Sequence, residues 1–362
     1  MDYFASGLSL TIGVDVLDRV SRVRLGELPG VRTIQVEKNL YNDLRMGAQI
    51  GVELQTAVSW RSIMLRLWMT LSLDGEEQKF PILTGVPRVG GSTRTDTVMT
   101  LTAAVMDPTC LLDDVIGTTY ALDVGSSVTT AISNIFVALG IQDYYVAASA
   151  STLRVPFSKP PETTWRQVIN ELGGMLGYAA AWSDSMGLIR VEPYVDPAKR
   201  AEVFELGYGA RSVTLPEVVS EFPDELPNHF VLVTSDEDPL IAEGWNDDPD
   251  NDYSTVNQRT VPYYAQVQAA DQASLNSQLD NVMAVNRSGN RTYQISHRWI
   301  PVDSTRVLEL QSAGRLIAPA YYVRGVKVEE ELDVKVAIVQ QSFSWSSGET
   351  VAHVQAQLRG AS

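Results

Sequence analysis

The residues of this sequence that could do chemistry are few and scattered. The three histidines are His229, His297 and His353, and each lies alone within or beside a stretch that alternates as a β-strand does. Catalysis or metal binding would require them to converge from distant segments together with carboxylates. Isolated histidines on sheets more often face solvent, so we assign them no catalytic role.

An acidic segment resembles the start of a calcium-binding loop. Asp248, Asp250 and Asp252 have the spacing of the first ligands. The match then fails, because the sixth position is not glycine and the twelfth is Arg259 instead of a bidentate glutamate. A plain acidic loop is the main interpretation, and loose binding of calcium or magnesium stays as the alternative.

Sequence motifs of common enzymes are missing. The chain has no nucleophile elbow, phosphate-binding loop or dinucleotide fingerprint, and Gly207-Tyr208-Gly209 is too short to count as one. The single cysteine, Cys110, lies among apolar residues and is expected to be buried rather than nucleophilic. We therefore predict no catalytic, cofactor-binding or metal-binding residues and no enzyme. A glycan hydrolase stays an alternative, since its two carboxylates need no fixed spacing.

Paired tyrosines are the remaining candidates for binding. Such aromatic pairs could stack on sugars or fill a subunit interface, although packing within strands is the more common use. A receptor- or glycan-binding adhesion module is favoured if the pairs lie together on one exposed surface. The pairs are Tyr144-Tyr145, Tyr263-Tyr264 and Tyr321-Tyr322.

Composition describes a folded protein with an acidic surface. The 362 residues are 44% hydrophobic and 20% charged, and a chain of this length forms about two to four domains. The net charge of −16 repels phosphate backbones and anionic lipids, so we do not expect a sequence-reading nucleic-acid binder. One cysteine excludes an intrachain disulfide. Residues 1–10 lack a basic signal-peptide start, and no window has the length of a membrane-spanning segment.

The first 105 residues have a mainly β pattern. Apolar residues alternate over 8–14, 63–73 and 98–103, and Asp74-Gly75 predicts a hairpin that returns over 80–86. We expect a β-barrel or sandwich over 1–105. A long loop or short helix is expected to interrupt it near Lys38–Ser59.

Residues 106–199 are expected to form an α/β insertion with two amphipathic helices and a hairpin. Ser127 caps the first predicted helix, over Val128–Leu139. Thr164 and Gln167 have the spacing of a capping box for the second. The apolar face of this second helix must be buried, with Gly177 after its end and a turn over Asp184–Gly187. Gly173, Gly174, Trp165 and Trp182 are interpreted as packing residues.

Residues 200–362 are again mainly β and are expected to form a second barrel. A short strand at His229–Thr234 is followed by an acidic run over 235–252, which we expect to be a solvated loop. A helix is predicted near 271–286, with Asp271 as its cap. Strands are predicted over Tyr293–Ile300, Tyr321–Val328, Val334–Trp345 and Val351–Leu358.

This order of elements resembles the tail hub proteins of bacteriophages, found at the tail tip or baseplate. The capped helix at Val128–Leu139 comes first, and the resemblance is good over residues 105–200. The motifs that carry it are Pro161-Glu162-Thr163-Thr164-Trp165-Arg166-Gln167-Val168-Ile169-Asn170-Glu171-Leu172, Leu176-Gly177-Tyr178, Trp182-Ser183-Asp184-Ser185-Met186-Gly187-Leu188-Ile189-Arg190-Val191-Glu192-Pro193-Tyr194 and, in style, Tyr321-Tyr322-Val323-Arg324-Gly325-Val326.

The resemblance implies a structural virion protein, made in the host cytoplasm and placed at the tail tip. Two tail-tube-like barrels, 1–105 and 200–362, would flank the α/β insertion 106–199. A homotrimer would form a pseudo-sixfold ring between the tail tube above and fibre, spike or tape measure proteins below. DNA would pass through without specific binding, and we expect an acidic channel wall from the net charge of −16.

Overall fold

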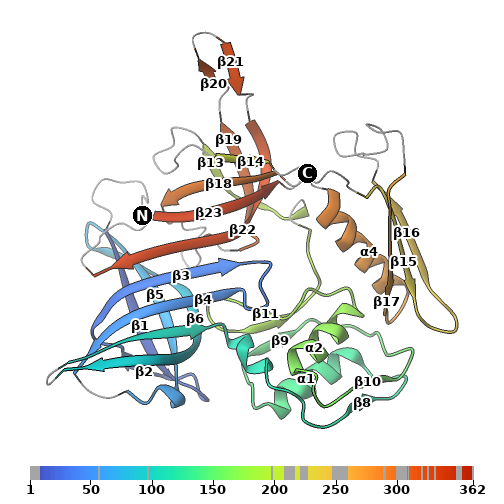
Figure 1. Ribbon diagram of the computed structural model, residues 1–362, viewed down its shortest axis with the longest axis horizontal. Helices are drawn as coiled ribbons and strands as arrows, with labels where there is room; N and C mark the ends of the chain where they lie inside the picture. The colour runs from blue at the N-terminus through green and yellow to red at the C-terminus, as the bar shows by residue number, and fades with distance from the viewer. Residues whose placement is uncertain are drawn as a thin grey trace.

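The computed structural model shows a mainly β chain with a small α/β part, which confirms the predicted fold class (Figure 1). None of the helices in the described part of the chain has the length and apolar run needed to cross a bilayer. The structure describes residues 9–55, 58–95, 98–196, 199–207, 217–220, 227–246, 260–287, 291–298, 308, 310–318, 321–323, 326–329, 332–347 and 353–360.

Seven strands form a unit that we call the N-terminal barrel. The hairpin predicted at Asp74-Gly75 is confirmed: both residues have positive φ angles, 51° and 84°, and they join β5 to β6. The shared core includes Ile34, Leu65 and Phe80. The strands are β1 (Ser9–Asp18), β2 (Arg24–Glu27), β3 (Val31–Asn39), β4 (Met46–Leu54), β5 (Ile63–Leu73), β6 (Glu76–Arg94) and β7 (Met99–Met106).

Strand β6 forms the corner of this barrel. Its first half, up to Gly85, pairs with β5, and its second half, from Val86, pairs with β7. A Cβ atom at Gly85 would lie 2.4 Å from the Met106 carbonyl oxygen and 2.8 Å from Val105. Only glycine therefore lets β6 approach β7 closely enough to pass from one sheet to the other.

The loop or helix expected near Lys38–Ser59 is wrong, because strand β4 lies there. Its residues alternate between buried and outward positions, with Met46, Ile50 and Leu54 facing the core. Glycine or a polar residue occupies each position between, and small residues weaken the alternation that sequence patterns detect. A short 3₁₀-helix follows, η1 (Trp60–Ser62).

The α/β part contains both predicted helices, packed on each other over a common core. The helices are α1 (Val128–Ala138) and α2 (Trp165–Gly174). The predicted hairpin is confirmed as a short pair, and the unpredicted strand β9 joins it in parallel. The other elements are η2 (Pro108–Leu112), β8 (Tyr120–Leu122), β9 (Tyr144–Val146), β10 (Phe157–Lys159), β11 (Trp182–Ser183) and β12 (Ile189–Val191).

Local signals at helix α2 are confirmed in most details. The Thr164 hydroxyl accepts a hydrogen bond from the Gln167 amide, and the Gln167 side chain accepts one from the Thr164 amide. Of the predicted packing residues, Gly173 approaches Val191 closely, but a Cβ atom at Gly174 would meet open space. Trp165 is only half-buried, with its ring edge-on to Tyr120.

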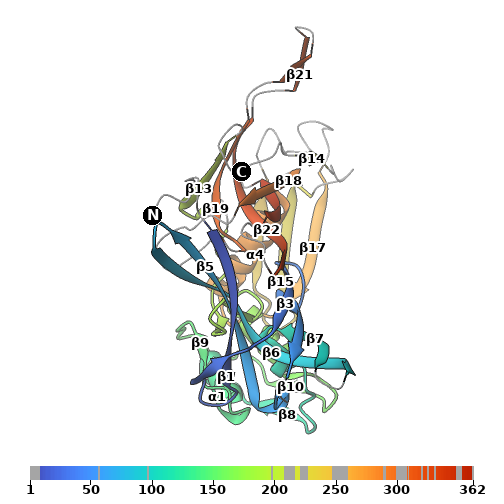
Figure 2. The ribbon, with the colours of Figure 1, turned by 90° about the vertical axis from the view of Figure 1, so that its left-hand side faces the viewer.

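A second set of strands forms what we call the C-terminal barrel. One strand was predicted over Tyr321–Val328. The structure instead has two short antiparallel strands there, the hairpin β20–β21, which projects from the molecule in both ribbon views (Figures 1 and 2). Strand β19 was not predicted. The barrel strands are β13 (Glu202–Gly207), β14 (Glu217–Ser220), β18 (Arg291–Arg298), β19 (Ala313–Ala318), β22 (Leu332–Ser346) and β23 (His353–Gly360), and the projecting hairpin is β20 (Tyr321–Val323) with β21 (Val326–Glu329).

Three strands and the predicted third helix form a smaller unit at the right of Figure 1. Strands β16 (Ile241–Trp245), β15 (His229–Thr234) and β17 (Pro262–Val267) form a sheet in that order, and helix α4 (Gln272–Arg287) packs on one face. The acidic run 235–252 was expected to be a loop, but β16 occupies its middle. Ala242 points into the core, and this alternation lets a strand form within an acidic run.

Candidate assembly interface

The three histidines are not brought together. His229 lies on β15 in the small sheet, whereas His297 lies buried on β18 and His353 belongs to the neighbouring strand β23. The ring of His229 stacks on Trp245, with 3.9 Å between centroids, and its Nε2 atom lies 2.8 Å from Glu243 Oε1. Sequence reasoning missed this stack because its partners come from two different strands.

The remaining candidates for chemistry are the acidic residues of the calcium-like segment and Cys110. Asp248, Asp250 and Asp252 lie outside the described residues, within which no group of three or more His, Cys, Asp or Glu side chains could hold a metal ion. Cys110 is buried beside Met64 and Val86, as predicted. Burial raises the pKa of its thiol to about 11, so the thiolate nucleophile is disfavoured.

The paired tyrosines do not form one surface. They lie on β9, β17 and β20, which belong to three separate sheets. Tyr145 and Tyr264 are exposed, whereas their neighbours Tyr144 and Tyr263 are turned towards cores. The side chains of Tyr321 and Tyr322 lie outside the described part of the chain. The arrangement that favoured a tyrosine-lined adhesion surface is therefore not found among the described pairs.

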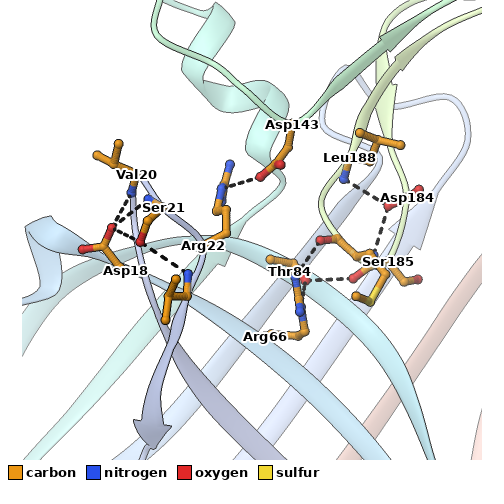
Figure 3. A network of polar contacts seen from close by, with 12 residues as sticks. Asp18, Val20, Ser21, Arg22, Arg66, Thr84, Asp143, Asp184, Ser185 and Leu188 are labelled. Carbon is orange, nitrogen blue, oxygen red and sulfur yellow. Dashed lines mark hydrogen bonds and ion pairs between the residues drawn. The ribbon is translucent and has the colours of Figure 1, made fainter.

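Arginine side chains fix the α/β part against the N-terminal barrel (Figure 3). Arg22 lies 2.8 Å from Asp143 Oδ2. Arg66 donates to the Thr84 hydroxyl at 2.9 Å and to the Met186 carbonyl at 3.1 Å. Thr84 in turn donates to the Ser185 carbonyl at 2.9 Å. Burial lowers the pKa of both arginines, yet each keeps hydrogen-bond acceptors, so the junction is polar and specific.

Arg166, on helix α2, links this junction to the interior of the α/β part, since Asp43 lies in the barrel and its other acceptors lie in the α/β part. Its guanidinium donates to the Asp43 carbonyl at 2.7 Å, the Thr109 carbonyl at 2.8 Å and Asp113 Oδ1 at 2.6 Å. One buried side chain thus joins the β3–β4 loop, the helix η2 and the helix α2. This side chain is therefore one of the ties that attach the α/β part to the barrel.

A second junction joins the α/β part to the small β15–β17 unit. Ser151 donates to Asp271 Oδ2 at 2.7 Å, and Asn281 on α4 donates to the Gly177 carbonyl at 3.0 Å. Arg154 pairs with Asp236 at 2.8 Å. Gly177 has a φ of +71°, and a Cβ atom there would lie 2.7 Å from Ser277. Glycine is therefore required both to end α2 and to let α4 approach.

The two barrels share one continuous sheet. Strand β22 pairs antiparallel with β3, from Gln340 opposite Asn39 to Ser346 opposite Thr33. The described strands from the N-terminal barrel follow in the order β3, β4, β7 and β6 on one side, and those from the C-terminal barrel in the order β22, β23, β18 and β14 on the other. Each barrel thus contributes four strands to the same wall.

The eight strands of this wall are bounded by two edges that pair with no strand among the described residues, although the sheet itself runs on from the first half of β6 to β5, β1 and β2. At one end, residues 86–94 of β6 pair with β7 on one side, and the other side pairs with no strand among the described residues. At the other end, β14 pairs with β18 alone within the described ranges. Unpaired amide and carbonyl groups along such edges are sites where another chain can add a strand.

The solvent face of the shared sheet is polar but not acidic. Charged side chains of both signs lie on it, Glu37 and Glu53 against Arg88 and Arg359. The acidic excess of the chain is therefore not concentrated among the described side chains of this face. Amides and hydroxyls predominate at its exposed positions: Thr33, Gln35, Gln49, Thr100, Thr102, Gln294, Gln340, Ser344 and Gln355.

Sequence comparisons give no match, since no protein-family model and no curated protein is similar to the chain. Solved structures share its fold. The tail protein from Neisseria meningitidis MC58 has a TM-score of 0.62 at 12% identity, over 98% of this chain and 97% of that one. The 43 kDa tail protein of prophage MuSo2 from Shewanella oneidensis has a TM-score of 0.57 at 13% identity, over 96% and 98%.

A third similar structure belongs to a larger protein. The Francisella PdpA-VgrG complex contains a chain with a TM-score of 0.56 at 11% identity; the match covers 99% of this chain and 54% of that one. Together these likenesses show that the chain has the fold of phage tail proteins, which confirms at the level of fold the family expected from its sequence.

Proposed function

We propose that this protein is the hub of a phage tail tip or baseplate, a structural part of the virion without enzymatic activity. Three copies form a pseudo-sixfold ring that joins the tail tube to distal fibre, spike or tape measure proteins. The protein is made in the bacterial host cytoplasm and assembled at the tail tip. The fold shared with phage tail proteins supports this role.

The observation that carries the proposal is the sheet shared by the two barrels. The β3–β22 junction repeats, within one chain, the kind of contact that neighbouring subunits of a ring make. The open edges of β14 and of residues 86–94 of β6 bound the eight strands of this wall, before the sheet runs on from β6 to β5, β1 and β2. If the β6 edge of one copy pairs with β14 of the next, three copies close a ring of six barrels with all these edges satisfied.

Passage of DNA through the ring is consistent with the face of the shared sheet. Glutamine, serine and threonine side chains predominate on it, and arginines are few. Phosphate groups bind mainly through lysine and arginine contacts that must be broken again before the strand moves. A neutral wall therefore lets DNA slide without specific binding. From the net charge we expected an acidic wall to have the same effect.

The domain division predicted from the sequence forms part of the proposal. Residues 1–105 and 200–362 each supply four strands to the ring wall, and 106–199 lie outside it. The small β15–β17 unit with α4 has a core of its own, around Phe230 and Leu279, within the second range. We place it as an attachment of the second barrel.

Immunogold labelling of intact particles tests the proposed location. Antibodies against the α/β part are expected to mark one end of the tail, distal to the head. Antibodies against the capsid protein serve as the control and should mark the head alone. Label along the whole tube, label on the head, or particles without this protein would contradict the proposal.

A further inference from the structure

One face of the small β16-β15-β17 sheet carries large exposed side chains. We call the outward side chains of these strands the platform. Residues that point inward, such as Phe230, pack on helix α4, so alternation turns their neighbours to the opposite side. Ile241, Trp245 and Tyr264 on the platform are 58%, 46% and 63% exposed. In Figure 1 this face turns away from the rest of the molecule.

Register places the platform residues in rows across the three strands. Trp245 lies opposite His229, while Glu243 and Tyr264 lie on either side of Val231. Outward side chains recur about every 7 Å along a strand, and strands lie about 4.8 Å apart. By this spacing the backbone positions of Trp245 and Tyr264 lie about 12 Å apart, with His229 and Val231 of the central strand between them.

The Trp245 ring is held in place before any ligand arrives. His229 stacks on one side of it at 3.9 Å with an interplanar angle of 11°, and Glu243 Oε1 lies 2.8 Å from His229 Nε2. A ring fixed in this way loses little conformational freedom when a ligand binds. Such preorganisation is typical of binding sites. Trp245 keeps nearly half of its surface exposed despite this stack.

The area of the platform decides whether it could hold a protein partner or a short sugar chain. Three strands with three outward residues each span about 14 Å by 17 Å, or roughly 240 Å². A stable protein interface buries about 800 Å² on each partner. The platform is therefore too small to hold a protein by itself, and it matches a short chain of about three linked sugar rings.

Chemistry narrows the ligand class. The C–H face of a sugar ring packs on the negative face of an aromatic ring, and the carboxylate of Glu243 accepts hydrogen bonds from hydroxyl groups. Glu243, with Glu237 and Asp238 exposed on the nearby β15–β16 turn, repels an anionic ligand. We propose that the platform binds a neutral, β-linked oligosaccharide, whose flat rings stack on Trp245 and Tyr264. This adds a binding role that does not depend on ring formation.

Isothermal titration of the full chain with cellotetraose and with N-acetylated chitotetraose tests this assignment. Wild-type protein is expected to bind at least one of them, and maltotetraose, whose α-linkages curl the chain, more weakly. The variant Trp245→Ala should lose at least about tenfold in affinity, and Tyr264→Ala a smaller factor. Trp245→Phe keeps a ring and should keep part of the binding.

Matched controls separate the platform from other exposed rings. Tyr145→Ala removes an exposed tyrosine on β9, in another sheet, and should leave saccharide affinity unchanged. Circular dichroism and the melting temperature establish that each variant is folded. The proposal is overturned if wild-type protein binds neither β-linked saccharide, or if Trp245→Ala binds equally well. It is also overturned if Trp245→Ala alters only the sedimentation of the protein, because the platform would then be a protein contact.

Discussion

Arg166 holds three segments of the chain together through one buried guanidinium group. Its acceptors are the carbonyl groups of Asp43 and Thr109 and the carboxylate of Asp113. Removing the donor leaves the carbonyl oxygen of the buried Thr109 without this partner, which costs more than the bond itself contributes. The sequence placed Arg166 within a helix that resembles those of hub proteins, but nothing in its spacing indicated acceptors 53 to 123 residues away.

The variant Arg166→Ala is expected to lower the free energy of unfolding by about 2–4 kcal/mol, because these hydrogen bonds are lost and the Thr109 carbonyl is left unsatisfied. The stability of Arg166→Lys should lie between those of wild type and Arg166→Ala, since an ammonium group cannot reproduce the several fixed donors of a guanidinium group. Urea unfolding measures both. The control is Arg32→Ala, which breaks the exposed pair with Glu53 and should cost below about 1 kcal/mol. Equal effects of the two alanine variants would show that Arg166 is not the tie described above.

Cys110 gives a prediction for alkaline pH. Burial raises the pKa of its thiol from 9.0 to about 11. Between these values the unfolded chain loses the thiol proton first, so rising pH favours unfolding; the stability is fully present below pH 9 and falls towards pH 11. The loss should reach about 2–3 kcal/mol in total. Urea midpoints of wild type and Cys110→Ala should diverge over this range, and parallel curves would contradict the assignment.

At the scale of elements, features that depend on neighbouring residues could be predicted from the sequence, whereas the pairing of distant strands could not. The capping box of α2 and the Asp74-Gly75 turn depend on neighbours in sequence, and both were predicted. Strand β4 was missed because its glycines weaken the alternation, and β19 was missed as well. The parallel pairing of β9 with β12 was also not predicted. The alternation of apolar and polar residues indicates a strand but does not specify which other strand pairs with it.

Gly85 is the element-scale feature with the clearest test. Gly85→Ala would place a Cβ atom 2.4 Å from the Met106 carbonyl oxygen, so β6 could no longer turn from one sheet to the other. We expect a loss of about 2–3 kcal/mol or a failure to fold. Gly90→Ala lies on the same strand in open space and should change stability by at most about 0.5 kcal/mol. Thermal melts of both variants make the comparison; a tolerated Gly85→Ala would mean that the corner relaxes.

For the whole molecule, the order of a β part, an α/β part and a second β part was evident from the sequence. The pairing of β3 with β22 was not, since Val36 and Phe343 lie about 300 residues apart and no spacing rule connects them. The sign of charge on the shared sheet was also unavailable, because the net charge of −16 does not say on which face it lies. Both properties are central to the proposed ring.

Cryo-electron microscopy of the purified full chain measures that ring most directly. The expected result is a closed particle of three copies, with a mass about three times the 39.7 kDa of one chain. The residue 86–94 edge of β6 in one copy should pair with β14 of the next, and the glutamine-rich face should line the channel. A closed dimer, or a trimer held through other surfaces with these two edges left unpaired, would contradict the account.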